Sequence, residues 1–323
     1  MITVIGEALI ELTPTSDTTT LRVLPGGSAL NIAVGAARLG CPAALIARLS
    51  RDPFGQLLRR HAVRNGVDLS AAPDADEPTA IAIAPAAGID RDVRPSLYSS
   101  GAPNWQWRPG DLAWIPADTS VLHIGSLAWC AASSAATVLR AASRARQRGA
   151  LVSMDVAVHP EVMRTPGQGR IMLERSLGAA DVIRTSMEDI GWLYPGRPPH
   201  AIAELWLRMG PGLVIITSGA GAMALRGPGF VLHRPVAYPA VVIDTAGADD
   251  AYTAALLTVL HACRRDGEAA RDLTTAALAD ALDVAGLVAG MTCERTGADP
   301  PTAAELRERR DQRSRCRAAV SGG

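Results

Sequence analysis

The chain contains no lysine, because all 32 of its Lys+Arg residues are arginine. This excludes chemistry that needs a lysine amine, such as Schiff-base formation, and it excludes the G-x-x-x-x-G-K-[ST] phosphate loop. No G-x-G-x-x-G opens the first strand–helix unit, so a dinucleotide-dependent oxidoreductase is a poor interpretation. The five cysteines are scattered without a C-x-x-C pair, which is typical of reduced thiols and disfavours a metal cluster.

Net charge and long hydrophobic runs are also missing. The formal net charge is zero, and no basic surface is indicated, so we expect no nucleic-acid partner. No uninterrupted apolar run approaches the roughly 20 residues of a membrane span, and no basic segment precedes an apolar one at the start. We therefore expect a soluble, cytoplasmic protein that has no membrane partner.

Apolar strand-like segments alternate with helical ones through most of the chain. This rhythm predicts an α/β fold, namely a doubly wound, mostly parallel sheet with helices on both faces. We expect one domain over residues 1–315. Two β-rich segments, 11–24 and 78–107, break the alternation and predict a small β lid inserted in that domain. Ser28 is expected to cap the first helix, and the run 241–243 is expected to be a strand.

Small or polar clusters follow several of the predicted strands. They lie at residues 25–31, 155, 184–189, 217–222 and 244–250. Each alone is more often a turn or a helix cap. Ligands of open α/β sheets bind beyond the carboxyl ends of the strands, so five clusters at that edge predict a binding site.

The segment "DTAGADD" at 244–250 joins an apolar run to a ten-residue helical stretch without charge. Its last residue, Asp250, is expected beside the unpaired N–H groups of a helix start, which favour negative charge. Asp250 therefore either caps the helix or acts beside an anion that the same N–H groups hold.

Four segments resemble the signatures of the ribokinase-like, or PfkB-type, carbohydrate kinases. They are "GGSALNIAVGAARLG", "ARLSRDPFG", "DTAGADDAYTAALL" and "CERTGADPP", and the resemblance extends over nearly the whole chain. The sequences of these segments most resemble those of fructokinase-type members. The resemblance implies a ribokinase-like fold and ATP-dependent phosphorylation of a primary hydroxyl of a sugar or sugar-like polyol.

The resemblance also implies roles for individual residues. Asp250 would be the general base, and the backbone of 246–250 would hold the transferring phosphoryl group, as helix N-termini can. The catalytic set is Asp250 with Gly247, Ala248 and Asp249. The acceptor set is Glu11, Gly26, Gly27, Asn31, Asn104 and Asp250. The nucleotide set is Arg184, Ser186, Thr217, Gly219, Gly221, Ala246 and Gly247. Glu188 and Asp189 would organise Mg²⁺ through water, although charge compensation at a helix start explains them equally well.

Some positions depart from the family pattern. Asp249 replaces a glycine next to the predicted base, and Arg184 replaces a lysine. The Asp249 carboxylate would repel an incoming phosphate unless it points to solvent or gains a cation. The departures at Ser50, Ala157, His159, Ala222 and Asp249 keep open a rival interpretation, a catalytically weakened member that binds sugar or nucleotide for regulation. The family resemblance further implies a homodimer through the lid, while the sequence leaves a requirement for a monovalent cation open.

Overall fold

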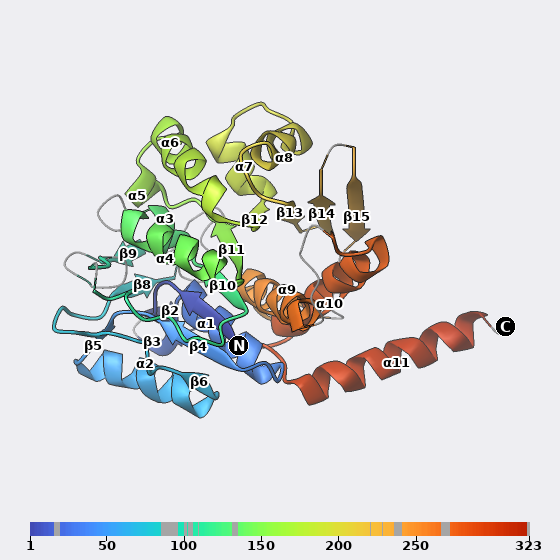
Figure 1. Cartoon of the computed structure of the whole chain (residues 1–323). Coiled ribbons are helices and arrows are strands. Elements are labelled where there is room, and N and C mark those ends of the chain that lie inside the picture. Colours follow the sequence, from blue (N-terminus) through green and yellow to red (C-terminus); the bar gives the residue numbers. More distant parts are fainter. Residues whose placement is uncertain are drawn as a thin grey trace.

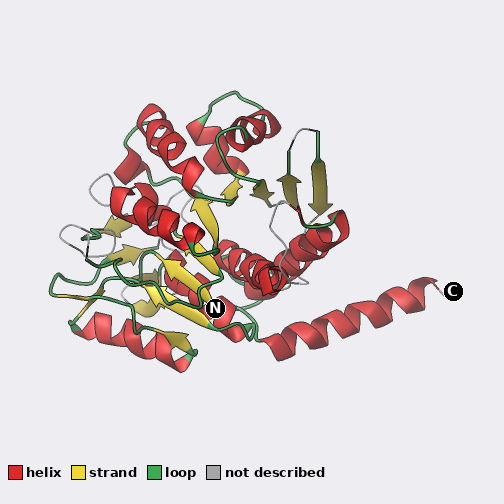
Figure 2. Ribbon diagram, viewed as in Figure 1, coloured by secondary structure: helices red, strands yellow, loops and turns green. Residues whose placement is uncertain are grey.

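The structure is a computed structural model (Figures 1 and 2). It describes residues 1–15, 20–84, 96–99, 102, 106–108, 110–130, 135–219, 221–227, 229–235, 241–265 and 272–321. Asn104 and parts of both predicted lid segments lie outside these residues.

A nine-stranded sheet forms the centre of the protein, with the order β15-β14-β13-β12-β11-β10-β1-β4-β6. Its strands are β1 (Ile2–Ile5), β4 (Ala43–Ile46), β6 (Val67–Asp68), β10 (Val121–Ile124), β11 (Leu151–Val156), β12 (Val182–Ser186), β13 (Leu213–Ser218), β14 (Gly221–Leu225) and β15 (Val231–Pro235). All neighbours are parallel except β13–β14 and β14–β15. The mostly parallel α/β sheet predicted from the sequence is therefore confirmed.

Helices cover both faces of this sheet. They are α1 (Ser28–Arg38), α2 (Pro53–Arg64), α3 (Ser126–Cys130), α4 (Ala135–Gln147), α5 (Pro160–Met163), α6 (Pro166–Ser176), η1 (Leu177–Ala179), α7 (Met187–Leu193), α8 (Pro199–Leu207), α9 (Ala248–Arg265), α10 (Thr275–Cys293) and α11 (Ala303–Ser321). In β1, Val4 packs in the core with α1, α9 and α10, while Ile5 packs in a second core with α3, α4 and α8. Adjacent side chains of a strand point to opposite faces, so burial on both sides explains the continuous apolar runs.

A separate four-stranded sheet lies beside the large one, at the left of Figure 1. It has the order β3-β2-β8-β9 and contains β2 (Leu9–Pro14), β3 (Leu21–Gly26), β8 (Ile81–Ile83) and β9 (Ser96–Tyr98). A further pair joins β5 (Leu49–Ser50) and β7 (Asp74–Ala75). The four-stranded sheet draws on both segments that the sequence assigned to a lid. Its action as a lid stays a prediction.

Two local expectations were wrong. Residues 241–243 form no strand, and their side chains are 58–63% exposed. The backbone N–H of Ile243 instead donates to the carbonyl of Cys293 at the end of α10, at 2.8 Å. The N-cap of α1 is Gly27, with φ 99°, and Ser28 is the first helical residue. Because Ser28 does not cap α1, its hydroxyl can form a hydrogen bond outside this helix.

Within the described part of the chain, α10 is the one helix that is long and apolar enough to cross a membrane. Of that apolar stretch 61% is buried inside the protein. It packs against α9 and β15, so its hydrophobicity is accounted for by the core. Helix α11, in contrast, runs outward from the body (Figure 1).

Candidate active site

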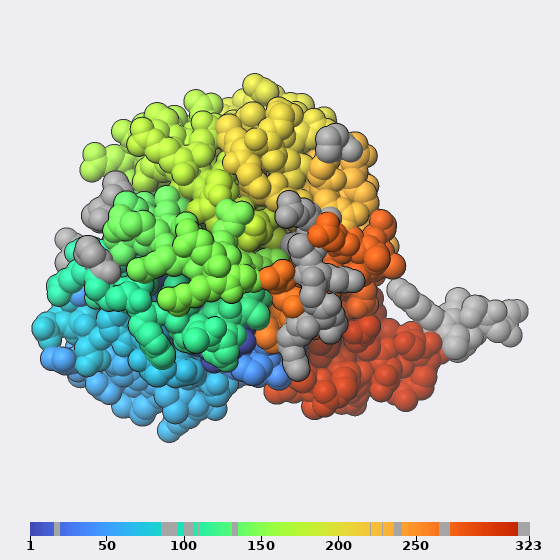
Figure 3. Space-filling view, in the orientation of Figure 1, coloured from blue at the N-terminus to red at the C-terminus, as the bar shows by residue number. Residues whose placement is uncertain are grey.

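A cavity of about 640 Å³ opens where the central strands end. The lid sheet contributes Glu11, the start of α1 contributes Ser28 and Asn31, and the start of α9 contributes Asp249 and Asp250. In the space-filling view, the N-terminal part in blue lies against the central part in green, and the C-terminal helices adjoin both (Figure 3). The cavity thus collects residues from four of the five strand-end clusters, whereas the cluster at 217–222 does not line it.

Asp250 is held at the cavity wall by two neutral donors. The hydroxyl of Ser28 donates to its Oδ1 at 2.7 Å, and the amide Nδ2 of Asn31 donates to its Oδ2 at 2.9 Å. Burial raises the pKa of Asp250 to about 7, although both hydrogen bonds act to lower it. A carboxyl group with a pKa near neutrality can accept a proton from a bound alcohol at physiological pH.

The start of α1 positions both donors. Ser28 and Asn31 are three residues apart and therefore lie on the same side of the helix. The Glu7 carboxylate, 3% exposed, accepts the backbone N–H of Ser28 at 3.0 Å, and burial raises the pKa of Glu7. Helix α1 also packs closely on α9, because a Cβ on Gly35 would lie 2.7 Å from the Cβ of Ala254.

The turn before α9 presents free backbone N–H groups. Asp244 shapes this turn by accepting the N–H of Ala246 at 3.0 Å and that of Gly297 at 2.8 Å. Gly247 has φ 71°, and a Cβ there would lie 2.5 Å from the Cβ of Ala298. The N–H of Ala248 bonds the Thr245 carbonyl.

These hydrogen bonds reduce the number of backbone N–H groups that can form the predicted anion hole. Among the described residues, no acceptor is found for the backbone N–H groups of Gly247, Asp249 and Asp250. The N–H groups of Ala246 and Ala248, which the sequence had included, are already engaged. Three N–H groups at the start of an 18-residue helix can hold a negatively charged group.

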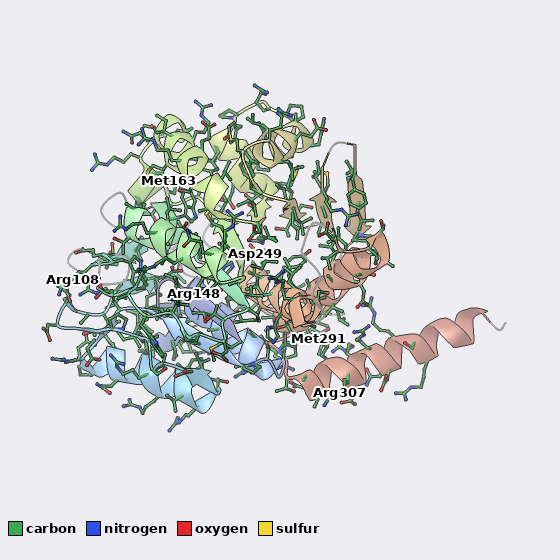
Figure 4. All side chains as sticks on the ribbon, viewed as in Figure 1. Arg108, Arg148, Met163, Asp249, Met291 and Arg307 are labelled. Carbon is green, nitrogen blue, oxygen red and sulfur yellow. The ribbon has the colours of Figure 1, made fainter. Side chains whose placement is uncertain are left out.

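The negative charge of Asp249, which is labelled in Figure 4, has a positively charged partner. Its carboxylate, 70% exposed, forms an ion pair with the guanidinium of Arg184, whose side chain is 3% exposed. Nη2 of Arg184 also donates to Oγ1 of Thr217 at 2.8 Å, and Nη1 donates to Oδ1 of Asp155 at 3.4 Å. Burial raises the pKa of Asp155 to about 6 against the opposing effect of Arg184. Burial acts to lower the pKa of Arg184, but Asp249 and Asp155 hold it above its usual value.

Comparison with known proteins shows the family of this chain. A family model described as "pfkB family carbohydrate kinase" matches residues 1–305. The fructokinase of Klebsiella pneumoniae is 32% identical over 271 residues, which are 80% of this chain and 84% of that protein. The chain belongs to the pfkB family of carbohydrate kinases. It is a sugar kinase.

Solved structures of related proteins have the same architecture. An uncharacterised sugar kinase from Pyrococcus horikoshii in complex with ATP is 27% identical and has a TM-score of 0.76, covering 94% of this chain and 96% of that one. The fructokinase of Xylella fastidiosa with bound ATP has a TM-score of 0.85 at 22% identity, covering 97% of this chain and 99% of that one. The ribokinase-like fold of this carbohydrate kinase is thus confirmed.

The predicted magnesium residues of this sugar kinase differ in their availability. Both carboxylate oxygens of Asp189 accept hydrogen bonds, from the Val158 N–H at 2.9 Å and from the Ser186 hydroxyl at 2.6 Å. Ser186 in turn caps α7 by accepting the N–H of Asp189 at 3.0 Å. Glu188 is exposed and lines the cavity. In the described ranges no three His, Cys, Asp or Glu side chains converge as a metal site.

The predicted nucleotide turn of this carbohydrate kinase joins β13 to β14. Thr217 is 6% exposed and contacts Arg184, so it touches the same guanidinium as Asp249. Gly221 lies at a close backbone approach, because a Cβ there would be 2.4 Å from the Arg234 carbonyl oxygen. Thr217, Gly219 and Gly221 do not line the 640 Å³ cavity; Gly221 lines a neighbouring one of about 450 Å³.

On the acceptor side, Glu11 lies against the Gly26–Gly27 backbone. A Cβ on Gly26 would be 2.2 Å from Oε1 of Glu11, so a larger residue at this position would displace the carboxylate. The N–H of Gly27 donates to Oε1 at 3.4 Å, and burial raises the pKa of Glu11. The two glycines therefore position an acidic side chain beside the cavity.

Three residues of the site were not assigned from the sequence. Ser28 was interpreted only as a helix cap, yet it binds Asp250. Glu7 fixes the start of α1, and Asp155 pairs with Arg184. The strand-end position of Asp155 was the available signal. For Ser28 the signal was its spacing of three from Asn31.

Proposed function

We propose that this sugar kinase transfers the terminal phosphoryl group of ATP to a primary hydroxyl of a sugar or sugar-like polyol, with Asp250 as the general base. One observation carries the proposal: a carboxyl group of pKa about 7 lines the cavity at the start of α9 and is held by Ser28 and Asn31. The choice of donor is supported by the ATP bound in the structures of the Xylella fastidiosa fructokinase and the Pyrococcus horikoshii sugar kinase.

The proposed reaction uses both ends of the cavity. The acceptor oxygen forms a bond to the terminal phosphorus while the bond from that phosphorus to the bridging oxygen of ADP breaks, and the hydroxyl proton passes to Asp250. Asp250 keeps lone pairs for this proton, because each oxygen accepts only one hydrogen bond in the structure. The N–H groups of Gly247, Asp249 and Asp250 would stabilise the charge on the migrating phosphoryl group.

Magnesium would supply charge neutralisation on the ATP phosphates when bound. Glu188, which is exposed and lines the cavity, would order its water ligands. Asp189 would act through its bonds to Ser186 and Val158, by holding the start of α7 and the segment after β11 in place.

The acceptor would be held by the carboxylate of Glu11 and the amide of Asn31. Both groups accept hydrogen bonds from hydroxyl groups, which suits a polyol. Because several relatives are named fructokinase, fructose is the first acceptor to test. Asn104, predicted to contact the acceptor, stays a prediction outside the described residues.

The deciding experiment measures ADP release from Mg·ATP with fructose and a panel of other sugars and polyols, with mass spectrometry of the product. We expect a sugar monophosphate, and loss of its formation in Asp250→Asn. If neither ADP nor a phosphorylated product forms while sugar or nucleotide still binds by calorimetry, the rival regulatory interpretation takes its place.

Assembly, ion dependence and location form finer parts of the proposal. Exposed apolar side chains of the lid sheet, Leu21 and Val23 on β3 and Tyr98 on β9, support a homodimer through that sheet. We expect a cytoplasmic enzyme with no nucleic-acid or membrane partner. Sedimentation and replacement of potassium by tetramethylammonium in the assay test the dimer and the monovalent cation.

A further inference from the structure

The ion pair between Asp249 and Arg184 joins two positions at which this chain departs from the family signatures. The resemblance leads one to expect glycine and lysine at these positions. The partners come from the start of α9 and from β12, 65 residues apart in the sequence. A lysine and a glycine could not form this contact, so the two departures belong to one structural feature.

The pair lies where the predicted phosphate ligands meet. Nη2 of Arg184 contacts Oγ1 of Thr217 on the nucleotide turn as well as the Asp249 carboxylate. The backbone N–H of Asp249 is one of the three free N–H groups of the anion hole. The Asp249 carboxylate is therefore paired with a cationic side chain, Arg184, that lies next to the place proposed for the phosphoryl group.

Charge and chemistry make Asp249 a rival of that group. Arg184 carries one positive charge between the carboxylates of Asp155 and Asp249, which leaves this cluster with a net negative charge. Guanidinium binds carboxylate and phosphate oxygens through the same N–H geometry. Nε of Arg184, moreover, is buried and has no acceptor among the described residues, so the guanidinium keeps an unused donor.

We propose that Asp249 is an internal competitor for Arg184, which the terminal phosphate of the bound nucleotide displaces. This inference rests on the proposed nucleotide-dependent function. When nucleotide is absent, Asp249 neutralises the buried guanidinium. When nucleotide is bound, the exposed carboxylate turns toward solvent and Arg184 joins the three N–H groups as a ligand of the terminal phosphate.

Calorimetry on the full-length protein tests the competition. The probes are the Mg²⁺ complex of AMP-PNP, which has a terminal phosphate, and adenosine, which has none. Asp249→Asn keeps the size of the side chain and removes its charge, so we expect about tenfold tighter binding of AMP-PNP with adenosine unchanged. Asp74→Asn is the matched control, since Asp74 is an exposed carboxylate paired with Arg51 and Arg59 outside the cavity lining, and we expect no change.

A crystal structure with AMP-PNP provides a second, independent readout. We expect Arg184 on the terminal phosphate and Asp249 released from it. An intact Asp249–Arg184 pair in that complex overturns the proposal, as does an affinity for AMP-PNP that is unchanged or weaker in Asp249→Asn.

The same measurements separate this inference from the proposed function. If neither wild type nor Asp249→Asn binds AMP-PNP or ADP at millimolar concentration, both ideas fall. If Asp249→Asn tightens AMP-PNP as expected but no sugar is phosphorylated, the kinase reaction fails while the competition stands.

Discussion

Asp249 and Asp250 are neighbours in the sequence, but their proposed roles belong to different ends of the cavity. Asp250, at the proposed acceptor end, is bound by two neutral donors, and burial raises its pKa to about 7. Asp249, at the proposed nucleotide end, pairs with a permanently charged guanidinium and is mostly exposed. Two identical side chains thus differ in their surroundings through the charge of their partners and their contact with water.

The largest effect on turnover is expected from a change to Asp250, at the proposed acceptor end of the cavity. Asp250→Asn removes the proton acceptor but can keep both neighbours, because the Ser28 hydroxyl can accept as well as donate. We expect turnover to fall by about three orders of magnitude, with nucleotide binding retained. Steady-state ADP release together with calorimetry measures this. A loss smaller than tenfold would show that Asp250 is not the base.

The turn between the two ends can be tested next. Gly247→Ala places a methyl group in a left-handed backbone conformation and 2.5 Å from the Cβ of Ala298. We expect about a hundredfold loss of turnover from the displaced N–H groups, and about 2–4 kcal/mol of lost stability. Chemical denaturation measures the second quantity.

Gly66→Ala is the matched control for that change. Gly66 also has positive φ, 78°, but a Cβ there would meet nothing within 4 Å. We expect only about 1 kcal/mol of lost stability and normal turnover. Equal losses in the two variants would show that backbone conformation alone, and not the contact with Ala298, constrains the turn.

A pH-dependent stability sharpens the comparison further. The pKa of Asp250 is about 7 in the folded state and near 3.8 in an unfolded chain, so the folded state binds more protons between these values. Asp250 therefore lowers stability increasingly as the pH rises from about 4 to 7. Asp250→Asn should be more stable than wild type by about 2 kcal/mol at pH 8, after allowance for water in the cavity, and equal to it near pH 4.

Thermal or urea unfolding across that pH range measures the difference. Asp74→Asn is the matched control, because Asp74 is an exposed carboxylate outside the cavity lining and its removal leaves the surroundings of Asp250 unchanged. A stability difference for Asp250→Asn that does not depend on pH would contradict the raised pKa.

The smallest expected effect concerns one hydrogen bond. Ser28→Ala removes a donor that favours the ionised form of Asp250, so the pKa of Asp250 should rise further. The acidic limb of the pH–rate profile should move up by about half to one pH unit, with activity recovering at higher pH. Ser126→Ala is the control, since Ser126 also lines the cavity but bonds His159 at 2.8 Å. Equal shifts of the acidic limb in both variants would show that the hydrogen bond from Ser28 does not specifically set the pKa of Asp250.

The sequence alone was sufficient for the mostly parallel sheet and the family, and it placed a helix close to Asp250, although α9 begins three residues earlier than the expected stretch. Strand and helix periodicity is a local property, and Asp250 stood in a motif that could be identified without coordinates. The contact between Asp249 and Arg184 could not be foreseen, because 65 residues separate them and their meeting depends on where β12 ends relative to α9. For the same reason Ser28 was assigned to the nearest backbone and not to Asp250, 222 residues away.

The wrong strand at 241–243 has a different cause. Three consecutive apolar residues, Val241, Val242 and Ile243, resemble a buried strand, but their side chains are exposed. Apolar composition predicts burial only when a neighbouring element is available to cover it. At this point the chain bonds to the end of α10 and turns toward Asp244.

The close contact at Gly35 and Ala254 has a consequence for how such an enzyme can be tuned. The proposed proton acceptor and the two groups that lower its pKa are mounted on two helices with almost no space between them. A single methyl group inserted at Gly35 would spread the helices and lengthen both of these hydrogen bonds together, so the pKa of Asp250 should rise. The optimum pH of the enzyme can therefore be adjusted from inside the core, without altering any group that touches the sugar.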